Sequence, residues 1–170
     1  MTSTLLFAAA IVASIAILIF LFTYIASRQK KKQVEKQNYY FIRAADAFGI
    51  SVQKMEMYRY RSIGCDADIK KLIYVDYSEE PYRHSLIELK NVSGSKIVVN
   101  TNNITKKVRG EQRIIDRITS SIQLSVHFKN NAFLPVILTV YKYGIDSQQD
   151  MQHLKKEAEF WNELINKNCG

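Results

Sequence analysis

Few side chains in this sequence combine the residue types and spacings that catalysis or metal binding requires. The six glycines form neither a GxGxxG nor a Walker pattern, so a phosphate-cradling loop of either kind is not expected. Asp66 and Asp68 stand beside Cys65, but one such cluster in a predicted turn does not indicate an active site. The histidines show no HxxxH or HExxH spacing: His84, His127 and His153. We therefore expect that the protein is not an enzyme and that it binds neither a metal ion nor a cofactor.

The charge of the chain is concentrated next to one apolar segment. Lys and Arg number 24 against 16 Asp and Glu, a net charge of +8 over 170 residues. Residues 1–27 carry no charged side chain, and residues 28–36 alone contribute +4. The remaining +4 is spread over residues 37–170, which hold 19 basic and 15 acidic side chains. A nucleic-acid-binding domain usually carries a basic stripe of its own, so no nucleic-acid partner is expected.

Residues 5–26 form an uncharged run of 22 residues with few polar groups, among them Ser14 and Thr23. As a helix this run would be about 33 Å long, which exceeds the ~30 Å hydrocarbon core of a bilayer. A cleaved secretory signal is the alternative, but such a signal has a basic n-region and a shorter apolar stretch. The sequence therefore predicts a single uncleaved membrane span that includes Leu5, Ile11, Ile15, Leu18, Phe22 and Ala26.

A cluster of basic residues follows this span directly. It consists of Arg28, Lys30, Lys31, Lys32 and Lys36. Positive charge resists translocation, so we expect a single-pass protein of the cell membrane with its N-terminus outside and everything after the span in the cytoplasm. The same lysines could bind anionic lipid headgroups. Ala9, Ala13 and Ala16 share a helix face along which the helices of two copies can approach closely, so a homo-oligomer is a further expectation.

The part of the chain after the basic cluster changes from helical to β-type patterning. Residues 33–48 carry apolar side chains at helical spacing and predict a juxtamembrane helix, with Gly49 after it. Five strands are expected at 71–77, 84–90, 96–101, 121–129 and 136–143, and weaker ones at 57–61 and 104–109. Residues 102–110 otherwise indicate a loop or a poor edge strand. Asn130 and Asn131 predict the turn between the last two strands.

The C-terminal segment predicts an amphipathic helix. Ser147 and Asp150 fit a capping box with Ser147 as the N-cap. The apolar stripe contains Trp161, the only tryptophan, and we expect this stripe to plug the core of the β-structure. Its members are Met151, Leu154, Ala158, Trp161, Leu164 and Ile165.

The order of these elements resembles the pleckstrin-homology-like superfold, particularly its bacterial variants. Three stretches carry the resemblance: residues 71–92, the hairpin 122–141 with Pro135 and Val136 after its turn, and the helix segment 159–164. The resemblance implies an α+β domain in which a strongly bent antiparallel sheet, or partly open barrel, of seven strands is closed by the C-terminal helix. The turn at 78–81 is acidic, so a phosphoinositide-headgroup pocket is not expected.

Three segments follow from these patterns: a membrane anchor at 1–27, a basic juxtamembrane helix at 28–50, and a cytoplasmic β domain with its C-terminal helix at 51–170. The arrangement favours a non-enzymatic interaction module that presents its domain to a protein partner at the membrane. The alternatives are a module that senses anionic lipids and an accessory subunit of a membrane complex.

Overall fold

The computed structural model describes residues 2–78, 80–108 and 111–169, and for residues 2–14, 106–108 and 111–115 it describes the backbone but not the side chains. The fold is α+β, with two antiparallel sheets and two α-helices. The chain divides into two compact units, residues 1–44 and 45–170, and each is described separately below.

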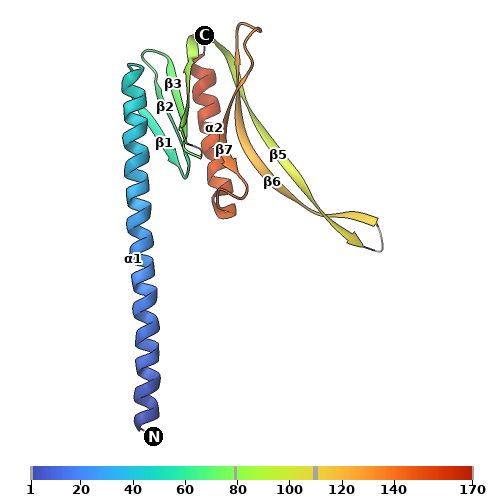
Figure 1. The fold of residues 1–170 in the computed structure, drawn as a ribbon. Helices are drawn as coiled ribbons and strands as arrows, with labels where there is room; N and C mark the ends of the chain where they lie inside the picture. Colours follow the sequence, from blue (N-terminus) through green and yellow to red (C-terminus); the bar gives the residue numbers. More distant parts are fainter. Residues whose placement is uncertain (1, 79, 109–110, 170) are drawn as a thin grey trace. The chain divides into compact units, whose positions relative to one another are not determined.

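The first unit consists of most of one long helix, α1 (Thr2–Ala47) (Figure 1). Its 46 residues correspond to a length of about 69 Å. Neither glycine nor proline occurs within it, which is why the predicted span and the predicted juxtamembrane helix form one continuous element. Gly49, with a φ of +63°, follows its C-terminal end in a left-handed conformation that costs glycine little.

The second unit contains two sheets. The first sheet has the order β1-β2-β3-β4, all antiparallel, with strands β1 (Lys54–Tyr58), β2 (Arg61–Asp66), β3 (Lys71–Asp76) and β4 (Arg83–Glu88). A single 3₁₀ turn, η1 (Leu89–Asn91), leads from β4 into the second sheet. That sheet has the order β5-β6-β7, with strands β5 (Val92–Val108), β6 (Glu111–Phe128) and β7 (Val136–Lys142).

Strands β5 and β6 are much longer than their neighbours. They pair over their whole described length, whereas β7 pairs with β6 only between Ser121 and Val126. The residues of β6 that precede Ser121 therefore pair with β5 alone. Together with β5 they form a two-stranded ribbon that extends away from the rest of the second unit (Figure 1).

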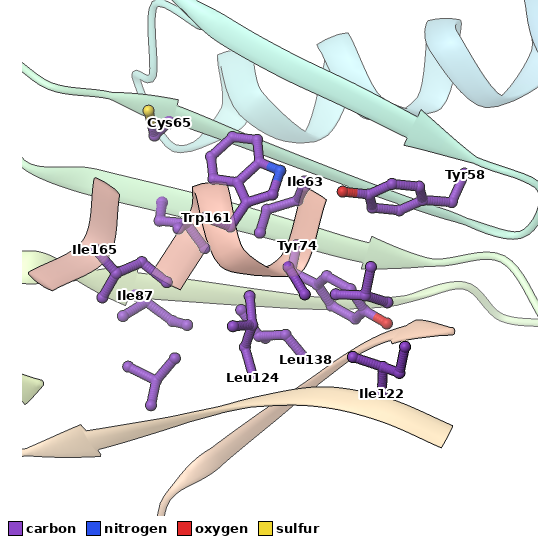
Figure 2. Packing of buried hydrophobic residues seen from close by; sticks show 14 of the residues in the cluster. Tyr58, Ile63, Cys65, Tyr74, Ile87, Ile122, Leu124, Leu138, Trp161 and Ile165 are labelled. Carbon is purple, nitrogen blue, oxygen red and sulfur yellow. The ribbon is translucent and has the colours of Figure 1, made fainter. Parts of the chain in front are cut away.

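The hydrophobic core lies between the inner faces of the two sheets and is completed by α2 (Met151–Asn168). Ile63 and Leu72 contribute from the first sheet, and Leu124 and Leu138 contribute from the second. Figure 2 shows the ring of Trp161 directed from α2 toward the strand that carries Ile63. Each of these five side chains is at most 1% exposed.

A buried ion pair also joins the two sheets. The Nη1 of Arg61 in β2 lies 3.0 Å from Oδ2 of Asp146, which follows β7, and the side chains are only 2% and 4% exposed. The same Nη1 donates to the carbonyl of Val140 in β7 at 3.2 Å. The Asp146 carboxylate also accepts a hydrogen bond from the backbone N–H of Lys142 at 2.7 Å. Each charged group is thus held by more than one partner, as a buried ion requires.

The structure corrects several details of the sequence interpretation. Instead of one bent sheet or partly open barrel there are two separate sheets, and neither closes into a barrel. The strand expected at 57–61 is not continuous, because β1 ends at Tyr58 and β2 begins at Arg61. Residues 102–108, expected as a loop or poor edge strand, are part of the edge strand β5 and pair with β6, with a register shift between Ile104 and Thr105. Ser147 caps the short 3₁₀ helix η2 (Gln148–Asp150), so the N-cap position of α2 falls to Asp150.

Candidate functional site

A cavity of about 470 Å³ opens beside strand β4. Its apolar lining comes from Leu86 in β4, Phe128 at the end of β6 and Phe133 in the loop between β6 and β7. Polar side chains complete it: Glu88, Asn91, Lys129 and Asn130. An apolar pocket with a few convergent polar groups is the usual form of a binding site.

The β6–β7 loop, whose Phe133 lines this cavity, presents two large apolar side chains to solvent. Phe133 is 64% exposed and Leu134, the next residue, is 87% exposed. The Phe133 ring packs edge-on against Phe128, with centroids 6.0 Å apart. Asn130 holds the loop in place, since its side-chain oxygen accepts from the Ala132 N–H at 2.9 Å and its carbonyl accepts from the Phe133 N–H at 3.1 Å. The aromatic side chain is therefore positioned by local hydrogen bonds.

The polar side of the cavity carries both signs of charge, from Glu88 and Lys129. Glu88 accepts a hydrogen bond from Asn91 at 3.0 Å and pairs with Lys90 at 3.2 Å, so its negative charge is already compensated. The backbone N–H of Lys129 donates to the carbonyl of Asn91 at 2.9 Å, which ties the end of β6 to η1. No acidic side chain among the described residues lies within ion-pair distance of the Lys129 ammonium.

Strand β4 is an edge strand, and the register shows which of its backbone groups are free. The Leu89 N–H donates to the Lys70 carbonyl at 2.8 Å, which continues the β3–β4 register as a hydrogen-bonded pair. Hydrogen-bonded and non-hydrogen-bonded pairs alternate in an antiparallel ladder, so Ile87 and Ser85 bond to β3. The N–H and C=O groups of Leu86 and the N–H of Glu88 therefore point away from β3 toward the open edge, whereas the Glu88 carbonyl is at the N-cap position of η1 and accepts within its first turn.

Asp66 and Cys65, which the sequence analysis considered as candidates for an active site, both occupy structural positions. The Asp66 carboxylate accepts from the backbone N–H groups of Ser51, Asp68 and Ile69, so it fixes a turn. Cys65 is 2% exposed, and burial raises the pKa of its thiol, which disfavours the reactive thiolate. No group of three His, Cys, Asp or Glu side chains suited to a metal ion occurs among the residues whose placement is described.

The apolar stripe predicted for the C-terminal helix lies on α2 and packs into the core. Leu154, Ala158, Trp161 and Ile165 are buried, and Met151 and Leu164 are partly buried against the same core. The Trp161 ring packs edge-on against Phe160 at a centroid distance of 5.6 Å. Because Trp161 is fully buried, it is not available as a stacking surface for a ligand.

The residues predicted for the membrane all lie on α1. Ile15, Leu18, Phe22 and Ala26 are exposed, as are Arg28 and Lys30 to Lys32, and the Arg28 guanidinium lies over the Tyr24 ring at 5.0 Å. Leu5 and Ile11 fall outside the residues whose side chains are described. Within the described residues, no helix combines the length and the apolar character that crossing a membrane demands.

The sequence interpretation missed the cavity, although part of its signal was present. Two large apolar residues, Phe133 and Leu134, occur in a segment that the Asn130-Asn131 pair marks as a turn, where exposed apolar side chains are unusual. The contribution of Leu86 had no such signal, because a Leu inside an apolar strand is ordinarily a core residue.

Comparison with known proteins adds no relative: the chain matches no protein-family model, no curated protein and no solved structure.

Proposed function

We propose that this protein is a non-enzymatic interaction module that binds another protein at the cavity between β4 and the β6–β7 loop. The observation that carries the proposal is the exposure of Phe133, which lines an apolar cavity, and of the next residue, Leu134. Exposed large apolar side chains grouped at one place on a folded domain characterise interaction surfaces. Aromatic anchors that enter pockets supply much of the binding energy of protein interfaces.

A membrane anchor forms the second part of the proposal. Support comes from the sequence: the uncharged run of residues 5–26 is long enough for one span, and the basic residues 28–36 follow it. With the N-terminus outside, the second unit faces the cytoplasm. Anchoring raises the local concentration of the module toward any partner in the same membrane, so weak contacts are sufficient. Digestion of the second unit by protease added outside intact cells would refute this topology.

A pleckstrin-homology-like fold is the third part. The order of seven strands followed by α2 supports it, because it is the order of elements that the resemblance implies. This part of the proposal concerns the scaffold only, since one fold serves many unrelated functions.

Site-specific photocrosslinking tests the binding proposal in intact cells. A photoreactive phenylalanine analogue replaces Phe133 in one variant and Tyr143 in the control, since Tyr143 is 49% exposed and does not line the cavity. We expect protein adducts from position 133 and none of the same mass from position 143. Adducts to lipid alone would favour the lipid-sensing alternative, and an absence of adducts at position 133 would refute the proposal.

A further inference from the structure

We propose that the cavity between β4 and the β6–β7 loop binds a second copy of this chain, with Leu134 of each copy seated in the cavity of the other around a two-fold axis. This inference rests on the proposed function and names the partner of that site. Because the two copies exchange identical side chains, the interface is isologous, and each copy contributes the same surface patch.

The patch carries both a hollow and a protruding side chain, which a self-complementary interface requires. Leu86, Phe128 and Phe133 line the cavity, and its volume of about 470 Å³ is in the range of sites that hold whole small ligands. Leu134 follows Phe133 directly and is 87% exposed, and it is not one of the lining residues. The Cα atoms of consecutive residues are about 3.8 Å apart, so the protruding side chain lies beside the hollow. A two-fold axis between them brings each Leu134 to the cavity of the other copy.

The charged groups at the cavity are available for a partner. Glu88 and Lys129 both line it, so the rim holds one charge of each sign. No acidic side chain in the described part of the chain lies within ion-pair distance of the Lys129 ammonium. Glu88 pairs with Lys90, but these side chains are 39% and 63% exposed, and exposed pairs contribute little. Glu88 can therefore exchange Lys90 for a cation of the partner.

A rim with both signs of charge favours a partner that also carries both. A partner with a single sign of charge is attracted by Glu88 or by Lys129 and repelled by the other. A second copy brings one group of each sign, in equal number and at the same rim. The rotation that exchanges the Leu134 side chains allows Glu88 of each copy to meet Lys129 of the other, which gives two opposite-charge pairs.

The predicted membrane anchor supplies a second copy in a suitable orientation. Copies anchored in one membrane share one topology, so a two-fold axis along the membrane normal relates a pair of them. Confinement to the membrane also raises the local concentration of each copy toward the other. Weak contacts at the cavity are therefore sufficient for association.

Photocrosslinking between two differently tagged copies of the full chain, co-expressed in cells, tests the arrangement. The first copy carries a photoreactive aliphatic amino acid at position 134, and the second copy is captured by its own tag. We expect an adduct that joins the two copies, and mass spectrometry should map it to residues 86–91 or 128–133 of the second copy. The same amino acid in place of Tyr143, which is 49% exposed and does not line the cavity, should give no such adduct.

Charge reversal tests whether the two opposite-charge pairs form. A copy with Glu88→Lys has two cations at its rim, and a copy with Lys129→Glu has two anions. When both copies carry the same change, the adduct yield should fall at least about fivefold, because like charges then meet. When one copy carries each change, the yield should return to within about twofold of the unmodified level. Recovery in this mixed pair also shows that both variants fold.

Two changes on α2 give the matched control. Glu159→Lys and Lys155→Glu alter the net charge of a copy by the same amounts, at exposed positions that do not line the cavity. We expect these copies to give yields within about twofold of the unmodified level in every combination. A response at the cavity without a response at α2 separates local pairing from attraction between oppositely charged copies.

Each outcome decides for or against the inference. If no adduct joins two copies while position 133 still crosslinks to a different protein, a second copy is not the partner and the proposed function survives. Equal yields in all charge combinations, or adducts confined to residues 1–44, would show that the copies meet at another surface and would overturn the inference. If neither position 133 nor position 134 yields a protein adduct, the proposed function fails as well.

Discussion

The buried ion pair between Arg61 and Asp146 provides a quantitative test of the structure. Replacing Asp146 by Asn keeps the size of the side chain but removes its charge, which leaves a guanidinium 2% exposed without an anion. Removal of one partner of a buried pair typically costs about 3–5 kcal/mol. At about 2–4 °C per kcal/mol for a chain of this size, the midpoint of thermal unfolding should fall by roughly 6–20 °C.

The fluorescence of Trp161 is a suitable assay, since it is the only tryptophan and is fully buried in the core. Glu56→Gln serves as the control, because Glu56 pairs with Lys54 at 3.5 Å on the surface, where such pairs contribute about 1 kcal/mol at most. Combining Arg61→Met with Asp146→Asn should destabilise the protein by about 1–3 kcal/mol less than the sum of the single changes. If Asp146→Asn shifts the midpoint no further than Glu56→Gln does, the ion pair does not hold the two sheets together as described.

Two further predictions concern the core. Trp161→Ala should lower the free energy of unfolding by about 3–5 kcal/mol, and Trp161→Phe by clearly less, because a phenyl ring refills much of the volume that Ala leaves empty. Denaturant titration followed by circular dichroism measures both losses, and equal losses would contradict this packing. Burial raises the pKa of Tyr77 to about 12, so the native state retains a proton that the unfolded state loses near pH 10. The free energy of unfolding should therefore fall as the pH rises from about 10 to 12, by up to about 1.4 kcal/mol per pH unit from this group. If the difference in unfolding free energy between wild type and Tyr77→Phe does not change over this pH range, the raised pKa of Tyr77 is contradicted.

Most secondary structure could be predicted because its signals are local. The alternation of Ile122, Leu124 and Val126 indicates a strand with one buried face, and these residues lie in β6 with that face in the core. The stripe that contains Trp161 indicates an amphipathic helix, and α2 buries this residue. Residues 102–108 show the limit of the method, because their strand forms through pairing with β6 and their side chains carry little β-type patterning.

The candidate site could not be predicted, because its parts come from separate segments. Leu86 belongs to β4 and Phe133 to the β6–β7 loop, and nothing in either local pattern indicates that they line one cavity. Arg61 and Asp146 are 85 positions apart, and each by itself has the appearance of an ordinary surface charge in the sequence. Such pairings depend on how the two sheets face each other.

The sequence by itself determined the α+β composition of the chain, its helical C-terminus and the concentration of apolar and basic residues in its first 36 positions. These features follow from composition and from side-chain periods of 2 and 3.6 residues, which operate over a few neighbours. Only the tertiary structure decided the division into two sheets, the free edge of β4 and the cavity beside it. Strand partners and cavities depend on contacts between residues distant in the chain, and local periodicity does not specify those contacts.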